Sequence, residues 1–444
     1  MQRQYFVEMK NITIFILICL AIPINTYSQQ EVEWLKQNIV SFSLDSAKDG
    51  DKEFEKLKKS IGNARIVLLG EQSHGDGTTF ETKVKLVRFL HQKMGFTVLA
   101  FESNQYNAER AWQDVFENKS PMTALQNSIF PIWGKAQEIQ PLFEYITLQA
   151  KTKKPLLISG FDCQPSGLYI NEKLEAEFSS YLLEKNIGFA NSEEELNFYT
   201  LFHAYQNGLY DVVKTKTWED KKRIWDSLRQ LKPLFLNILD KKTGELSLIS
   251  DSKAKLYLQF WKSVKLYLPE LLYLSGVDKS GGNTIKNLRD SLMAENLIWL
   301  ANEYYPSQKI IVWAASYHLA KHKSIGYGNL RETLMGDFIR KELDAQTYTI
   351  TFTAYEGNTG WYNGKNLNTV SKPADSSFEG LFYKTGSENF FLDFRTNSKT
   401  KNGNWLLTPR IMRPLGYMSQ EKIWPLVFDA VIFNRTMKKV NSIK

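Results

Sequence analysis

Residues 65–77 restrict the possible folds more than any other part of the chain. Residues 65–69 (Arg-Ile-Val-Leu-Leu) form a short β-branched and aliphatic run that is typical of a buried strand. A polar turn with three glycines follows, and apolar residues then recur at helical spacing from Phe80 to Leu90. The pattern predicts a strand, a turn and a helix over about 79–93. Ligands bind at such strand ends in open α/β sheets.

The turn carries groups suited to acid–base chemistry. It reads Gly-Glu-Gln-Ser-His-Gly-Asp-Gly, which places Glu71 and His74 three residues apart. A carboxylate and an imidazole can transfer protons as a pair, and the glycines let the backbone turn tightly. Surface residues that make local hydrogen bonds would show the same pattern, so this stretch alone leaves both interpretations open.

Three further strand-like runs end in chemically active residues. The runs are 97–101, 156–160 and 309–313, and they lead to Glu102, Asp162 and His318. Helical patterns separate the runs, so the predicted fold is α/β, with a central, largely parallel sheet flanked by helices. The carboxyl ends of parallel strands meet at one edge, and we therefore expect these side chains to converge with Glu71 and His74. For Asp162, a role as a helix cap or in a loop hydrogen bond is as well supported as a role in the site.

The rest of the chain predicts three more regions around the α/β domain, which would comprise residues 63–164 and 283–440. Residues 165–282 carry long amphipathic runs and no good strand, which indicates a mostly helical insertion or lid. Residues 29–62 are expected to form N-terminal helices. Residues 1–28, with an apolar run too short to span a membrane comfortably, are typical of a signal peptide.

Localisation and partners follow from these features. We expect a secreted or periplasmic protein without stable membrane insertion after signal cleavage; an uncleaved anchor or a lipoprotein is the alternative. The net charge is +8, but the lysines are scattered, which favours solubility over nucleic-acid binding. The expected partner is therefore a small-molecule substrate. Only Cys163 remains after cleavage, which excludes an internal disulfide.

Five motifs in order resemble the erythromycin esterase family across about residues 60–435. They are Gly-Glu-x-x-His-Gly at 70–75, the glutamate that closes the second strand at Glu102, Arg-Asp-x-x-Met-Ala-x-Asn at 289–296, and Phe-Asp-Ala at 428–430, together with Trp-Ala-Ala-Ser-Tyr-His at 313–318, where the family has Trp-Ala-His-Asn-x-His. Three positions depart from the family's pattern, and one of them is Ser316 in place of the asparagine. Ala315 stands where the family has the first histidine of a pair, the usual candidate for the water-activating base, and Lys83 stands where it has an arginine.

The resemblance implies hydrolysis of an ester or lactone, macrolide-like or other, without a metal or a covalent nucleophile. The predicted catalytic residues are His74, Glu71, Glu102 and His318: one histidine takes a proton from water and one glutamate orients it. N–H groups at the start of the helix after the turn are expected to bind the oxyanion. The predicted substrate-binding residues are Lys83, Arg289, Tyr317 and Asp162.

Two alternatives stay open. Glu71, His74 and His318 with an acid can ligate zinc or manganese, so a metal-dependent hydrolase or peptidase with a divalent metal is the alternative to a cofactor-free enzyme. Ala315 in place of the family's histidine also allows a non-catalytic homologue that binds a ligand in the same pocket. No Gly-x-Ser-x-Gly motif is present, which disfavours a serine hydrolase.

Overall fold

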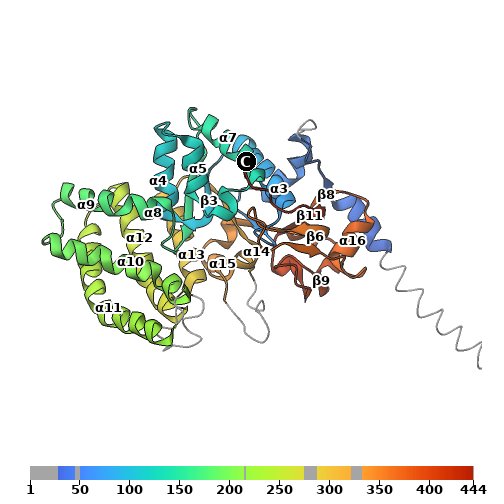
Figure 1. The fold of residues 1–444 in the computed structure, drawn as a ribbon. Helices are drawn as coiled ribbons and strands as arrows, with labels where there is room; N and C mark the ends of the chain where they lie inside the picture. Colours follow the sequence, from blue (N-terminus) through green and yellow to red (C-terminus); the bar gives the residue numbers. More distant parts are fainter. Residues whose placement is uncertain (1–28, 46–50, 215–216, 275–287, 322–332, 444) are drawn as a thin grey trace, which may run out of the picture.

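The computed structural model describes residues 29–45, 51–214, 217–274, 288–321 and 333–443, so the predicted signal peptide lies outside the described residues. At its centre is a sheet in the order β1-β8-β11-β6-β2-β5-β3-β4, with β7 paired to β6 (Figure 1). Its strands are β1 (Val40–Ser41), β2 (Ile66–Glu71), β3 (Phe96–Asn104), β4 (Leu157–Asp162), β5 (Lys309–Ala315), β6 (Thr347–Thr359), β7 (Asn368–Val370), β8 (Asn389–Asp393) and β11 (Ala430–Met437).

The six strands from β11 to β4 are parallel to one another, and β8, β1 and β7 pair antiparallel at the margins. The prediction of a largely parallel sheet is therefore confirmed. The sequence did not reveal β1, β7, or the separate pair β9 (Arg410–Met412) and β10 (Gln420–Lys422), because strands of two or three residues are too short to show an alternating pattern. Within 29–62, residues 29–38 and α2 (Glu55–Ile61) are helical, and β1 lies between them.

Helices cover both faces of the sheet because successive strand side chains point to opposite sides. Val67 and Leu69 of β2 face a core that includes α3 (Gly77–Met94), whereas Ile66 and Leu68 face α13 (Leu288–Trp299) and α15 (Met335–Leu343). The remaining helices of this part that matter for the site are α4 (Gln105–Phe116), α5 (Pro121–Ser128), α6 (Pro131–Gly134), α7 (Gln140–Gln149), α14 (Ser316–Leu319) and α16 (Phe378–Lys384).

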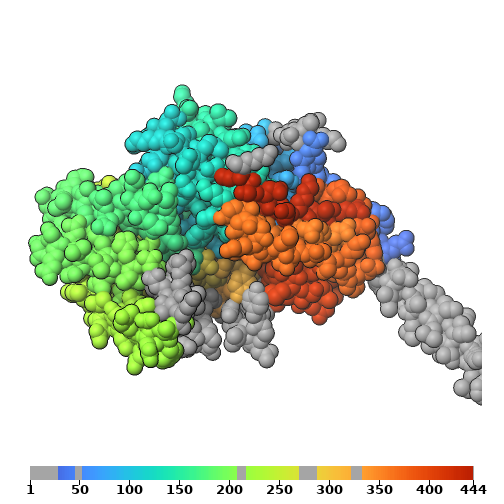
Figure 2. All heavy atoms as spheres, viewed as in Figure 1, coloured from blue at the N-terminus to red at the C-terminus, as the bar shows by residue number. Residues whose placement is uncertain are grey.

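The segment expected to be helical forms a lobe with its own core. Its helices are α8 (Leu168–Glu172), α9 (Leu174–Glu184), α10 (Ser192–Lys214), α11 (Trp218–Leu246) and α12 (Ser252–Leu274). They enclose a cluster rich in aromatic side chains and contact α4 and α13. The space-filling view shows this lobe, in green, beside the cyan α4–α7 region (Figure 2). Within the described residues, no helix has the length and apolar character needed to cross a bilayer.

The order of the central strands positions the site. β5 follows the insertion in the chain but lies between β2 and β3, so Glu71 pairs with Ala315 while Trp313 pairs with Phe101. The chain changes direction across the sheet here, and such switch points form crevices at strand ends. A Cβ atom on Gly70 would lie 2.5 Å from Oγ of Ser316, so only glycine allows α14 to approach β2 this closely.

Candidate active site

The carboxylate of Glu71 is fully buried at the end of β2 and is held from three sides. Its Oε1 lies 3.1 Å from Nδ1 of His74 and accepts a hydrogen bond of 2.9 Å from Nε1 of Trp133. Its Oε2 is paired with Nζ of Lys83. The ring of His74 also stands edge-on to that of Trp133, with centroids 5.1 Å apart. These contacts fix both the position and the orientation of the His74 imidazole.

Lys83 lies behind Glu71, away from any surface. Its side chain has no exposed area, and Nζ also contacts the carbonyl oxygen of Ala314 at 3.3 Å and the ring of Trp313 at 4.6 Å from the centroid. Burial lowers the pKa of Lys83, and the adjacent Glu71 opposes that shift. The expectation that Lys83 contacts substrate stays a prediction; in the structure its ammonium group is enclosed and is paired with Glu71.

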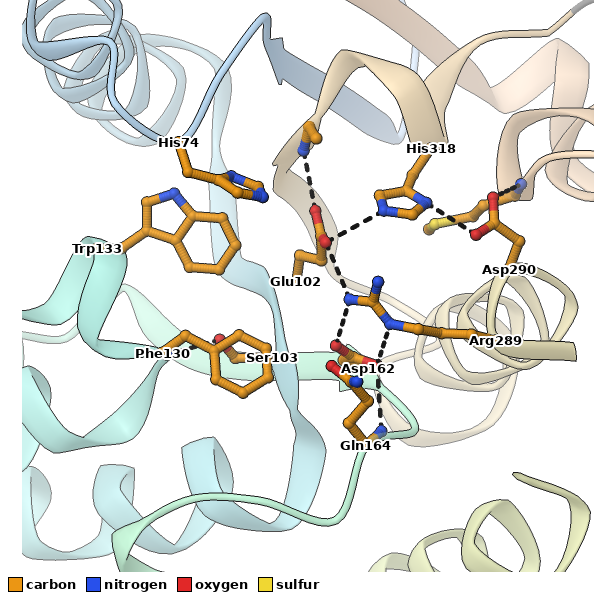
Figure 3. A network of polar contacts seen from close by, with 12 residues as sticks. His74, Glu102, Ser103, Phe130, Trp133, Asp162, Gln164, Arg289, Asp290 and His318 are labelled. Carbon is orange, nitrogen blue, oxygen red and sulfur yellow. Dashed lines mark hydrogen bonds and ion pairs between the residues drawn. The ribbon is translucent and has the colours of Figure 1, made fainter. Parts of the chain in front are cut away.

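A second network surrounds Glu102 at the end of β3 (Figure 3). Oε1 of Glu102 lies 3.0 Å from Nη2 of Arg289 and 3.3 Å from Nε2 of His318, and Oε2 accepts a hydrogen bond of 2.9 Å from the backbone N–H of Ala315. Burial by itself raises the pKa of Glu102, but the His318 and Arg289 cations outweigh burial and hold it well below its usual range. Glu102 is thus a carboxylate at neutral pH.

His318 is a buried cation in this network. Its Nδ1 lies 2.8 Å from Oδ1 of Asp290, so both ring nitrogens contact carboxylates. Burial alone lowers the pKa of His318, but Asp290 and Glu102 raise it to about 10. A histidine that keeps its proton at neutral pH cannot accept another one from water. Of the two histidines predicted as the base, His74 contacts one carboxylate and His318 contacts two.

Asp162 and Arg289 form the outer part of the Glu102 network. The guanidinium of Arg289 is bidentate on Asp162, with distances of 3.2 Å from Nε and 2.7 Å from Nη2, and the backbone N–H of Gln164 also donates to Asp162. The side chain of Asp162 has no exposed area, whereas that of Arg289 is 23% exposed. Asp162 therefore positions Arg289. Of these two side chains, only that of Arg289 is exposed enough to contact a substrate.

Tyr317 lies beside His318. Its ring lies 5.5 Å from that of His318, and it packs against the apolar cluster that includes Phe428. Sequence reasoning did not foresee Trp133 and Asp290 as partners of the predicted residues. Asp290 had a signal, since it follows Arg289 in the helix motif, but nothing in the sequence connects Trp133 to Glu71.

A cavity of about 470 Å³ opens beside His74. Ala315 lines it as well, so the cavity lies where the two networks meet. The side chain of His74 is 28% exposed. Because Nδ1 faces Glu71, Nε2 is the nitrogen left for a substrate or water. Figure 3 shows His74 beside Trp133, on the opposite side of Glu102 from Arg289.

The start of α3 does not serve as the expected oxyanion site. The backbone N–H of Gly77 donates to the carbonyl oxygen of Lys438 at 2.8 Å, and Asp76 forms a β-bridge with Lys439. Thr78 and Thr79 are buried as well. The chain that leaves β11 covers the first turn of α3, so this helix end is closed to a substrate.

The residues proposed as metal ligands lie in two separate networks. Glu71 and His74 bond each other, whereas both nitrogens of His318 are engaged by Asp290 and Glu102. Across the described parts of the chain, no three His, Cys, Asp or Glu side chains are grouped so that they could hold a metal ion. The metal-dependent alternative therefore has no ligand set among these residues, although only an assay with a chelator tests it.

Comparison with known proteins identifies the family. The family model "Erythromycin esterase" matches residues 91–437, well over half of the chain. The chain belongs to the erythromycin esterase family. The predicted resemblance is thereby confirmed, and membership supports a hydrolase. The matched region begins after Glu71 and His74, so the placement of these two residues rests on the structure.

Two relatives of this erythromycin esterase homologue match it over most of both chains. A putative hydrolase, YbfO of Bacillus subtilis (strain 168), is 29% identical over 404 residues, covering 88% of this chain and 87% of its own. Erythromycin esterase type II of Escherichia coli is 22% identical over 400 residues. The match covers 82% of this chain and 88% of that relative.

Two solved structures share the fold. A succinoglycan biosynthesis protein superposes with a TM-score of 0.74 at 20% identity, covering 94% of this chain and 99% of its own. A variant of the erythromycin esterase EreC in its open conformation superposes with a TM-score of 0.64 at 16% identity. The match covers 90% of this chain and 98% of the EreC chain.

Proposed function

We propose that the protein is an exported hydrolase that cleaves an ester or a lactone with water activated by His74. The observation that carries the proposal is the contact of 3.1 Å between Nδ1 of His74 and Glu71 at the wall of the cavity. Because Nδ1 faces Glu71 in this contact, we assign Nε2 as the nitrogen that takes the proton from water. His318, which is held as a cation between Asp290 and Glu102, is the less suitable of the two histidines for this role.

The reaction can be written with these side chains alone. Nε2 of His74 removes a proton from a water molecule as the water oxygen bonds to the carbonyl carbon of the ester. Glu71 accepts the Nδ1–H hydrogen bond and stabilises the imidazolium. When the bond from carbon to the leaving oxygen breaks, the imidazolium returns the proton to that oxygen. The products are a carboxylic acid and an alcohol, or a hydroxy acid from a lactone.

The negative charge that develops on the carbonyl oxygen requires a donor. We propose Arg289 for this role, because its guanidinium is partly exposed and permanently charged. Asp162 and Glu102 raise the pKa of Arg289 well above its already high value, against the effect of burial. Asp290, His318 and Glu102 would then fix the face of Arg289 that meets the substrate.

Hydrolysis by purified protein from Gln29 onward tests the proposal. A macrolide and a panel of simple esters, lactones and amides are assayed with and without EDTA, alongside His74→Ala. We expect EDTA-resistant turnover that His74→Ala abolishes, with its circular dichroism spectrum unchanged. Turnover lost with EDTA and restored by metal would instead support the metallohydrolase. Ligand binding without turnover would support the non-catalytic homologue, with Ala315 in place of a histidine as its cause.

A further inference from the structure

The cavity beside His74 has a distinctive lining. Most of its side chains are amides and hydroxyls that carry no charge. They come from the turn after β2, from the end of β6, from the loop to β7, from β7 itself and the residue after it, and from the turn after β9: Gln72, Ser73, Thr359, Asn366, Asn368, Thr369, Ser371 and Tyr417. Trp361 adds a large aromatic face. Such a surface offers both donors and acceptors to hydroxyl groups and a flat apolar wall to C–H groups.

The charges around the cavity do not favour an ionic ligand. No Asp, Glu or Lys is among the residues that line it, and Arg413 is the only Arg. The guanidinium of Arg413 is already bonded to backbone carbonyl oxygens, at 2.7 Å for Ser371, 3.1 Å for Ala354 and 3.2 Å for Tyr355. These bonds hold the chain around β6 and β7 and engage both Nη atoms of Arg413, while Nε has no hydrogen-bond partner among the described residues.

The walls of the cavity are tied to the catalytic turn. The backbone N–H of Gly360 donates to the carbonyl oxygen of Gly75 at 3.0 Å, and that of Gly416 donates to Gln72 at 3.0 Å. A Cβ atom on Gly75 would lie 2.5 Å from the nitrogen of Gly360, so glycine is required for this approach. A ligand bound between these walls is therefore held at a fixed distance from His74.

Position 315 adds room to this cavity. Ala315 lines the cavity between His74 and Glu102, and its backbone N–H is bonded to Glu102. The family's pattern has a histidine here, whose ring would extend toward the space that the alanine leaves.

We propose that this cavity binds an uncharged, hydroxyl-rich part of the substrate, a glycosyl group or another cyclic polyol, directly next to the ester that His74 cleaves. Trp361 stacks on the C–H face of the ring, and Asn366, Asn368 and Thr369 bond its hydroxyls. The inference rests on the proposed hydrolase function, because it names the substrate class for the same site. It predicts esters of sugars rather than esters of simple alcohols as the preferred substrates.

Binding is measured first, independently of turnover. Saturation-transfer NMR compares methyl glycosides with cyclohexanol, a ring of similar size without the hydroxyl pattern. The variants are Trp361→Ala and, as a matched control, Trp218→Ala, which removes an exposed tryptophan on α11, outside the cavity lining. We expect glycoside binding in the wild type and in Trp218→Ala, and a loss of about fivefold or more in Trp361→Ala. Asn368→Ala, at an exposed position, is the second variant if Trp361→Ala does not fold.

Turnover separates this inference from the proposed function. The ratio of kcat/KM for methyl 6-O-acetylglucoside to that for cyclohexylmethyl acetate is expected to exceed about tenfold in the wild type and to fall in Trp361→Ala. A ratio near one with measurable turnover overturns the cavity assignment and leaves the hydrolase standing. Glycoside binding with no turnover of either ester supports the cavity assignment and contradicts the hydrolase. Glycoside binding that is absent, or undiminished in Trp361→Ala, overturns the cavity assignment.

Discussion

Nδ1 of His74 lies 3.1 Å from Oε1 of Glu71, and this pair lies at the edge of a cavity while the second predicted histidine is enclosed. The two histidines thus differ in the number of carboxylates they contact. One carboxylate orients His74 and leaves a nitrogen free, whereas two carboxylates hold His318 as a cation. The assignment of the base follows from this difference rather than from distance to a substrate.

Glu71 and Lys83 are expected to be strongly coupled in stability. Glu71→Gln leaves a buried ammonium without its partner, and Lys83→Met leaves a buried carboxylate, so each single variant should lose about 3–5 kcal/mol in the free energy of unfolding. In the double variant neither charge remains, and its loss should be smaller than the sum of the two by about 1–3 kcal/mol. Urea unfolding of the four proteins measures the coupling, and additive losses would contradict the buried pair.

The proton on His318 should make stability fall in alkaline solution. The folded protein holds this proton up to about pH 10, whereas an unfolded imidazole loses it near pH 6.5. The stabilisation is complete below about pH 6.5 and is lost as the pH rises through about 10, with a slope of at most about 1.4 kcal/mol per pH unit. His318→Gln should lack this part of the slope. Unfolding curves between about pH 7 and 9.5 measure it, and equal slopes would exclude a buried imidazolium.

Asp76 should make the free energy of unfolding depend on pH in a lower range than His318 does. Burial raises its pKa to about 7, against hydrogen bonds from Tyr417 and the backbone N–H of Ser73. An unfolded aspartate titrates near pH 3.9, so stability is expected to fall as the pH rises from about 4 to about 7. Asp76→Asn keeps the acceptor and should flatten this slope. Glu109→Gln should remove a second contribution to the same slope, because burial also raises the pKa of Glu109 to about 7. No change in Asp76→Asn would show that Asp76 does not contribute.

The sequence predicted those parts of the fold and site that depend on local pattern. The strands before Glu71, Glu102, Asp162 and His318 were apolar runs long enough to recognise, and the parallel arrangement then required that their ends meet. What it could not predict depends on contacts between distant residues. Tyr417 bonds Asp76 across 341 residues, and Trp133 reaches Glu71 from α6, with no pattern to connect either pair.

Burial also decided roles that residue type alone left open. Lys83 has the charge expected of a substrate-binding group, but its place on the inner face of α3 makes it a support for Glu71. His318 has the chemistry of a base, but its second carboxylate, Asp290, comes from α13. The start of α3 was expected to bind an oxyanion, and the chain after β11 covers it. Each of these outcomes was set by packing between elements far apart in the sequence.

The kcat of His74→Gln and of His318→Gln, on the best ester found in the panel, distinguishes the two histidines. The His74→Gln variant should lose about 10²–10⁴-fold in kcat while its melting temperature stays close to that of the wild type, because the ring is partly exposed. The His318→Gln variant should show its main effect in stability, since it removes the cation that lies between Asp290 and Glu102 and leaves Glu102 with Arg289 alone. A His74→Gln protein that keeps the wild-type kcat would contradict the assignment of His74 as the base.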